Sequence, residues 1–234
     1  TCPLINFNMK KSSSSISLDS GVIFKILETI SKLVLSLNQE NEKNKDNKYN
    51  VNILHKLLLN TLRIKNIDIN AVDKFNNNIL AVLLSYMYEL NTSCCALYFE
   101  HVINSILENF EDIDVNYRTN DNKILLETIV INGNFELFEK FCNHPMIDFT
   151  TLTSQGSNIS FLLIDKINEV NENNKKSRYI MTLMNLLNAN GFNINSLNHE
   201  DKNLVSYMCS KPNTVVNLQI IKKLIEMNIY MFDS

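Results

Sequence analysis

The chain has 234 residues, of which 45% are hydrophobic and 20% are charged, so it can bury a sizeable core and is not compositionally disordered. Its 4 glycines and 3 prolines are too few for the many tight turns of a β-sandwich or a barrel, which favours helices. The formal net charge of −3 supplies no basic surface for a phosphate backbone, so we expect no direct binding of nucleic acid.

The cysteines indicate a reducing environment. They are odd in number and show neither a C-x-x-C motif nor a paired zinc-ligand spacing. The 5 cysteines are Cys2, Cys94, Cys95, Cys142 and Cys209. We therefore expect an intracellular protein, either cytoplasmic or nuclear.

No apolar run is long enough to predict a membrane span. The best candidate, 21–37, is interrupted by Lys25, Glu28 and Lys32 and reads as one amphipathic helix. We expect no membrane partner.

Taken in chain order, residues 1–19 contain the run Ser12–Ser15 and predict a flexible lead-in. A helical pattern of apolar residues then covers 20–37, a polar loop is expected at 38–48, and a second helix covers 50–64. The same reading predicts four further helix pairs. These are 78–90 with 95–109, 123–131 with 134–143, 158–168 with 179–190, and 202–210 with 214–227.

The segments between helix pairs repeat. Ile67–Asn70, Ile113–Asn116 and Ile147–Thr150 are similar, and 192–195 and 228–231 are weaker copies. After four of these segments a turn-like polar stretch leads into a short tetrapeptide that opens a helix. The tetrapeptides begin at Asn78, Lys123, Asn158 and Asn203.

This pattern resembles the ankyrin repeat family, whose units of about 33 residues contain a β-turn and two antiparallel helices. The clearest unit is 114–148. Ile79, Ile124 and Ile159 stand where the family has proline, and the turn glycine corresponds to Asn76, Asp121 or Gly156. The resemblance implies an all-α fold, an ankyrin-repeat α-solenoid of about five helix pairs with short turn or hairpin fingers. The repeat domain would cover 20–234, with units at about 20–67, 68–113, 114–147, 148–192 and 193–228.

Two features of the repeats leave alternatives open. The tetrapeptide Asn52-Ile53-Leu54-His55 also matches a helix opening, although too few residues follow it for a helix pair, so we place it within a second helix. The stretches 38–48, 90–94 and 169–178 are insertions at one edge of the array. They would form either a binding edge or neutral surface loops, which are thermodynamically cheap.

The sequence contains no coherent catalytic or metal-binding set. Cys94 and Cys95 precede His101, but two helical turns separate His101 from Cys94, too far for a nucleophile–base hydrogen bond. A metal site that adds Cys142 and His144 has no ligand spacing to support it. The acidic stretch 108–114 reads as a solvated turn. There is no phosphate-binding glycine loop, and we predict no enzyme activity, no cofactor and no metal.

The resemblance implies a non-catalytic domain that binds a partner protein through its turn fingers and its concave groove, a host protein if the source is an intracellular pathogen or virus. Phe75 and Tyr117 are aromatic turn residues that would anchor a partner, unless Tyr117 packs on the neighbouring finger. The predicted contact residues are Lys74, Phe75, Asn76, Tyr117, Arg118, Thr119, Asn120, Asp121, Ser154, Gln155, His199 and Glu200.

The alternative is a structural, positioning or regulatory module of a larger enzyme or adaptor whose active part lies outside this chain. The start at Thr1, without methionine or a signal peptide, makes a domain cut from a longer protein the expectation. Asparagine is the commonest residue, and because AT-rich coding explains that bias we assign the Asn-rich runs no function.

Overall fold

The computed structural model describes residues 21–39, 45–64, 67–89 and 93–227, and the side chains of 35–39, 45–52 and 93–95 are not part of that description. These ranges contain ten α-helices and no strand, so the fold is all-α. The helices are α1 (Gly21–Gln39), α2 (Lys45–Leu62), α3 (Ile79–Glu89), α4 (Ser93–Asn109), α5 (Leu125–Asn132), α6 (Phe135–Cys142), α7 (Ile159–Glu169), α8 (Asn173–Leu187), α9 (Leu204–Cys209) and α10 (Val215–Glu226).

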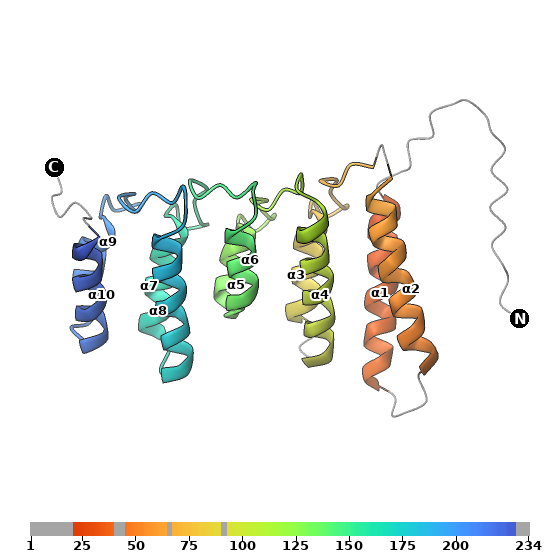
Figure 1. Cartoon of the computed structure of the whole chain (residues 1–234), viewed down its shortest axis with the longest axis horizontal. Helices are drawn as coiled ribbons and strands as arrows, with labels where there is room; N and C mark the ends of the chain where they lie inside the picture. Colours follow the sequence, from red (N-terminus) through yellow and green to blue (C-terminus); the bar gives the residue numbers. More distant parts are fainter. Residues whose placement is uncertain (1–20, 40–44, 65–66, 90–92, 228–234) are drawn as a thin grey trace, which may run out of the picture.

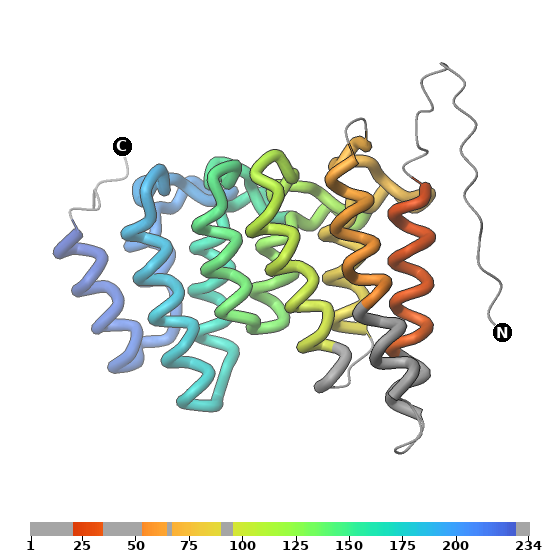
Figure 2. Tube along the Cα trace, turned by 45° about the vertical axis from the view of Figure 1, so that its right-hand side comes forward, coloured from red at the N-terminus to blue at the C-terminus, as the bar shows by residue number. Residues whose placement is uncertain are grey.

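The helices form five antiparallel pairs that stand side by side in sequence order, with the long connections gathered at one end (Figure 1). Within each pair the odd helix packs on the following even helix. The odd helices also pack on one another along the row, as do α4, α6 and α8, which makes two layers (Figure 2). The largest fully buried side chains, Tyr179, Phe99 and Phe141, come from the even helices and fill the space between layers and neighbours. Each pair therefore shares its core with the next.

The connections contain four equivalent turns, which we call fingers one to four: 73–78, 119–124, 153–158 and 198–203. In each, the N–H of the fourth residue donates to the C=O of the first at 2.9 or 3.0 Å. The fourth residue has a positive φ of 57°, 64°, 73° and 58° in turn. These residues are Asn76, Asn122, Gly156 and Asp201. Asn and Asp tolerate this left-handed conformation, so a finger does not require glycine.

The predicted alignment of finger two with the other fingers was wrong by one residue. Asp121 was expected at the left-handed position, but Asn122 occupies it, and Ile124 is the N-cap of α5. Ile124 therefore matches the capping Asn78, Asn158 and Asn203, and not Ile79. Each capping Asn accepts a backbone N–H through Oδ1, at 2.8 to 3.0 Å, which stabilises the helix start. Isoleucine has no acceptor, so apolar similarity alone misled the alignment.

Two predicted loops are largely helical. α2 begins at Lys45 instead of about 50, and α8 begins at Asn173 instead of 179. In α8 the polar first turns lie over the start of α6, where the Arg178 guanidinium stacks 4.5 Å from the centre of the Phe135 ring and donates to the Glu136 carboxylate. Tertiary contact thus extends a segment without apolar periodicity. α2 is continuous through His55, so Asn52-Ile53-Leu54-His55 does not open a helix.

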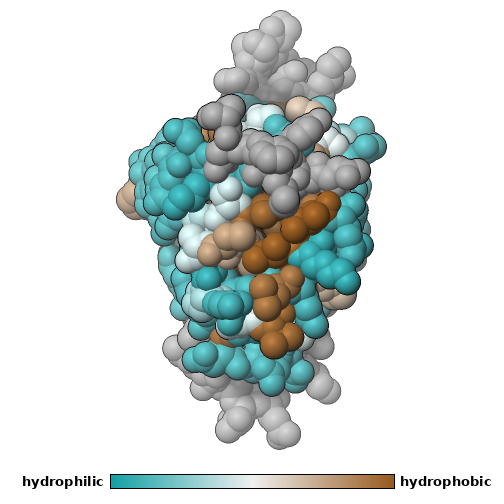
Figure 3. Space-filling model, turned by 90° about the vertical axis from the view of Figure 1, so that its left-hand side faces the viewer, coloured by the Kyte–Doolittle hydropathy of each residue, from teal (hydrophilic) through white to brown (hydrophobic). Residues whose placement is uncertain are grey.

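Some expectations lie outside the described residues: the lead-in 1–19, most of the stretch 90–94, and the last repeat segment 228–231. In the described part no helix is long and apolar enough to cross a membrane. α10, the last helix of the row, exposes Val215, Leu218 and Ile225. Figure 3 views this end of the molecule and shows hydrophobic residues gathered in a band across it.

Candidate functional site

Fingers one and two are joined by their own side chains. The Tyr117 hydroxyl donates to the Asn76 carbonyl at 2.6 Å. The Asn76 amide reaches the Asn120 Oδ1 at 3.3 Å, and the Asn120 amide donates to the Phe75 carbonyl. Burial, with Asp73 and Asp114 nearby, raises the pKa of Tyr117. Tyr117 therefore packs on the neighbouring finger, which was the expected alternative to its anchoring a partner. The side chains of Asn76 and Asn120 face each other.

Arg118 and Ser154 are also committed to internal bonds. Arg118 donates to the Asn122 carbonyl at 2.6 Å and to the Leu152 carbonyl, which ties finger two to the loop before finger three. The Ser154 N–H donates to Glu127 Oε2 at 2.8 Å, and its hydroxyl donates to Oε1. Glu127 is 3% exposed. These residues hold the fingers in position.

Asp121 and Glu200 form ion pairs in solvent. Asp121 forms an ion pair with Lys123 at 2.7 Å and accepts from the Thr119 hydroxyl at 2.5 Å. Both bonds, Lys123 first, lower the pKa of the Asp121 carboxyl. Glu200 lies 2.8 Å from Lys202, whose ammonium is the main cause of the lowered pKa of Glu200. These exposed groups remain reachable by a partner.

His199 is bonded to another finger and is also exposed to solvent. Its Nδ1 lies 3.3 Å from the Ser157 hydroxyl, which also accepts the His199 backbone N–H at 3.4 Å. The side chain of His199 is nevertheless exposed. A substitution at His199 would therefore alter both the finger and the surface.

Phe75 is the most exposed aromatic side chain of the fingers, at 61%. The Lys74 ammonium lies 4.9 Å from the centre of its ring. Gln155, at the matching place in finger three, is also exposed. An apolar ring in solvent costs free energy unless a partner covers it.

Phe75 stands between two hollows. The first hollow, of about 590 Å³, lies between α1, finger one and α3, and Phe24, Val72, Val82 and Tyr86 supply its apolar walls. The second hollow, of about 490 Å³, lies between fingers one and two and helices α3 and α5. Glu89, Asp121, Lys123 and Thr128 make it more polar. Together with Phe75 they form a groove between the fingers and the odd helices.

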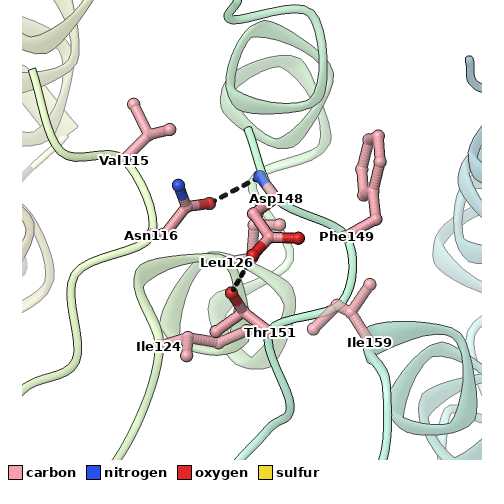
Figure 4. Close-up of a pocket in the computed structure, with 8 residues that line it drawn as sticks. All are labelled: Val115, Asn116, Ile124, Leu126, Asp148, Phe149, Thr151 and Ile159. Atoms are coloured by element: carbon pink, nitrogen blue, oxygen red, sulfur yellow. Dashed lines mark hydrogen bonds between the residues drawn. The ribbon is translucent and has the colours of Figure 1, made fainter. Parts of the chain in front are cut away.

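A small interior cavity lies where the loop before finger three meets α5 and α7 (Figure 4). Its volume of about 10 Å³ is that of a single water at most. Asn116 Oδ1 accepts the Asp148 N–H at 2.8 Å, and the Thr151 hydroxyl donates to Asp148 at 3.5 Å. This place joins two repeats and holds no ligand-sized space.

Asn116 and Asn70 play the same part in successive loops. Asn70 Oδ1 accepts the Asp114 N–H at 2.7 Å, and its amide donates to the Asp112 carbonyl at 2.9 Å. Asn116 repeats this pattern with the Asp148 N–H and with the Met146 carbonyl at 2.7 Å. Sequence reasoning assigned these asparagines no role. The signal in the sequence was that asparagine is the last residue of both similar segments, 67–70 and 113–116.

The candidate chemical groups are dispersed. The side chains of Cys94 and Cys95 lie outside the described residues. Cys142 is a free thiol whose burial, aided by Glu139, raises its pKa to about 12. His144 is buried and its Nδ1 accepts the Met146 N–H at 3.3 Å. Among the described residues no three His, Cys, Asp or Glu side chains come together as metal ligands.

The acidic residues of 108–114 lie in the last turn of α4 and in the turn that follows it. Glu108 forms a surface ion pair with Lys140 at 3.0 Å, and Glu111 and Asp112 are exposed. Comparison with known proteins adds no assignment: no protein-family model matches this sequence, and no curated protein matches it.

Proposed function

We propose that this chain is a non-catalytic protein-interaction domain with an ankyrin-like solenoid, and that it binds a segment of a partner protein across Phe75. The main support is the position of Phe75, an exposed aromatic ring that lines both hollows. Aromatic side chains of this kind supply large contact area at low entropic cost. The row of helix pairs gives the groove a rigid base.

The ankyrin-like part of the proposal is supported by the recurrence of structure. The four fingers share one turn geometry, and the loops before fingers one and two each carry an asparagine that bridges to the next loop. Such units bury their apolar faces on their neighbours, as ankyrin repeats do. The proposed partner is a protein inside the cell, because the free thiols suit a reducing compartment.

The predicted contact set divides into two groups, with His199 belonging to both. Lys74, Phe75, Asp121, Gln155 and Glu200 present groups to solvent. By contrast, Asn76, Tyr117, Arg118, Thr119, Asn120 and Ser154 hold the fingers in position, and changing them is expected to disturb the fold. A test of binding therefore substitutes Phe75 alone, as Phe75→Ala, and leaves Arg118 and His199 unchanged.

The experiment is affinity capture from cell lysate followed by mass spectrometry, with the wild-type chain and Phe75→Ala run in parallel. Leu152→Ala, an exposed apolar residue away from the groove, is the matched control. We expect proteins that the wild type and the control retain and that Phe75→Ala loses, with the helical circular dichroism of all three alike. A specific protein retained equally by Phe75→Ala would exclude this groove, and no specific protein at all would favour the positioning role.

A further inference from the structure

The contact between the first and second helix pairs is built differently from the others. Between α2 and α4, the His55 ring meets the Tyr98 ring at 6.0 Å and the His101 ring at 5.4 Å between centroids, both edge to face. The Arg63 guanidinium donates to the Asn109 Oδ1 at 2.5 Å. Aliphatic and phenylalanine side chains dominate the core elsewhere, whereas this contact relies on polar aromatic rings.

Two of the rings in this contact, His55 and Tyr98, carry a buried polar atom without a hydrogen-bond partner. Within the described part of the chain, four buried side-chain atoms have no hydrogen-bond partner, and all belong to α2, α3 or α4. They are His55 Nε2, Tyr88 Oη, Tyr98 Oη and Asn104 Oδ1. A buried polar group without a partner destabilises the packed arrangement, because the open arrangement lets water bind to it. The first joint of the row is therefore expected to open more readily than the others.

The imidazole of His55, in edge-to-face contact with His101, makes this joint sensitive to protons. Burial first, and His101 second, lower the pKa of His55 below its ordinary value of 6.5. The packed joint thus binds fewer protons than the open one. Its stability is full above about pH 6.5 and falls as the pH drops below that value.

The carboxylates on the helices packed around His55 already have other partners. On α1, Lys25 and Lys32 both pair with Glu28. On α4, Glu100 accepts from the Asn134 amide at 3.2 Å. On α3, Glu89 accepts from Ser85 at 2.8 Å. On α2 the nearby charged residue is Lys56, and Arg63 follows the end of the helix.

The joint is also part of the candidate groove. One wall of the first hollow is α1, through Phe24, Lys25 and Glu28, and the opposite wall is α3, through Val82 and Tyr86. α1 packs on α2, so it moves with His55 whenever the first pair leaves the second.

We propose that mild acid releases the first helix pair from the second at the His55–His101 contact and so takes apart the first hollow. The loss of the hollow is a property of the chain alone; its consequence for partner binding rests on the proposed function.

Hydrogen exchange followed by mass spectrometry tests the release without any partner. After correction for the intrinsic exchange rate, peptides from α1 and α2 are expected to lose protection between about pH 7.5 and 5.5, by up to about tenfold per pH unit for one linked proton. Peptides from α6 to α8 are expected to keep theirs. Equal responses along the row, or none in α1 and α2, would overturn the proposal.

Variants identify the responsible group. His55→Phe keeps an aromatic edge against His101 without a titrating nitrogen, and His55→Gln keeps a polar side chain of similar reach; both are expected to remove the pH response. His199→Gln, in the distant finger four, is the matched control and should retain it. A response that persists in both His55 variants would exclude His55 as the sensor.

Binding separates this proposal from the proposed function. Phe75→Ala is expected to abolish partner binding at every pH while its α1 and α2 peptides still lose protection in acid. Wild-type binding that weakens in acid, together with His55→Phe binding that does not, would connect the joint to the groove.

Discussion

Glu127 shows how a single buried side chain determines the position of a loop. It lies in the first turn of α5 at a place where α3 has Ala81 and α7 has Phe161, and its carboxylate accepts both the N–H and the hydroxyl of Ser154. A buried carboxylate without such donors would be costly. Finger three is therefore fixed to the preceding helix pair by one charged residue.

Replacement of Glu127 by Ala is expected to lower the free energy of unfolding by about 1 to 3 kcal/mol, because it leaves the Ser154 N–H and hydroxyl without acceptors. Urea denaturation monitored by circular dichroism measures the change. Glu108→Ala, which removes an exposed ion pair to Lys140, is the control and should cost about 1 kcal/mol or less. Equal losses in the two variants would contradict a structural role for Glu127.

At the scale of elements, the turn between α5 and α6 and the start of α8 depend on each other. Gly133 ends α5 with a φ of 71°, and a Cβ there would lie 3.2 Å from the Tyr179 hydroxyl and 3.0 Å from Lys175 Cε. Tyr179 cannot yield easily, since its hydroxyl donates to the Val130 carbonyl at 2.9 Å. The polar beginning of α8 is thus packed on the preceding pair.

Gly133→Ala is expected to destabilise the protein more than Gly191→Ala does. Both residues have left-handed φ, which costs a non-glycine residue about 1 to 2 kcal/mol. A Cβ at Gly191 meets no atom within 4 Å, so only Gly133→Ala adds steric displacement of Tyr179. Thermal and urea unfolding of the two variants compare them directly. A Gly191→Ala loss as large as that of Gly133→Ala would show that the contact with α8 is loose.

For the whole molecule, stability comes from neighbouring pairs that share a core, so each joint is a place where the row can open. The joint between α6 and α8 contains the half-buried thiol of Cys142, whereas Cys209 at the end of α9 is exposed. The two thiols report on closed and open states of the row.

At about pH 8, a thiol-alkylating reagent is expected to modify Cys209 well before Cys142 in the native protein, because the thiolate is the nucleophile and the pKa of Cys142 is raised to about 12. Peptide mass spectrometry over time measures both rates. In denaturing urea the two rates should converge. Comparable rates in the native protein would mean that the joint between the third and fourth pairs opens freely.

Much of the architecture was readable from the chain. The spacing of apolar residues predicted the helix pairs, because one face of each helix must be buried, and the similar segments at 67–70, 113–116 and 147–150 marked the repeat. The shift at finger two came from Ile124, an apolar residue that occupies a capping position. The late start predicted for α8 had a different source: the contacts of Arg178 with Phe135 and Glu136 lie 42 or more residues away in sequence.

The sequence predicted where the candidate site lies, but it did not predict the role of each of its residues. Turn composition located the fingers, and Phe75 was recognised as an aromatic residue with no helix to cover it. Nothing local distinguishes Phe75, which remains exposed, from Tyr117, whose hydroxyl reaches the preceding finger. The same holds for Asn70 and Asn116, whose bridges join loops more than 30 residues apart.

The sequence by itself determined the all-α class, the helix pairs and the polar turns between them, because periodicity, capping and turn preference act over a few neighbouring residues. Tertiary structure decided which finger residues bind to other fingers, which remain free, and where two histidines meet. Those outcomes depend on the distance between successive helix pairs, which is set by the packing of the shared core and is not encoded in any single pair.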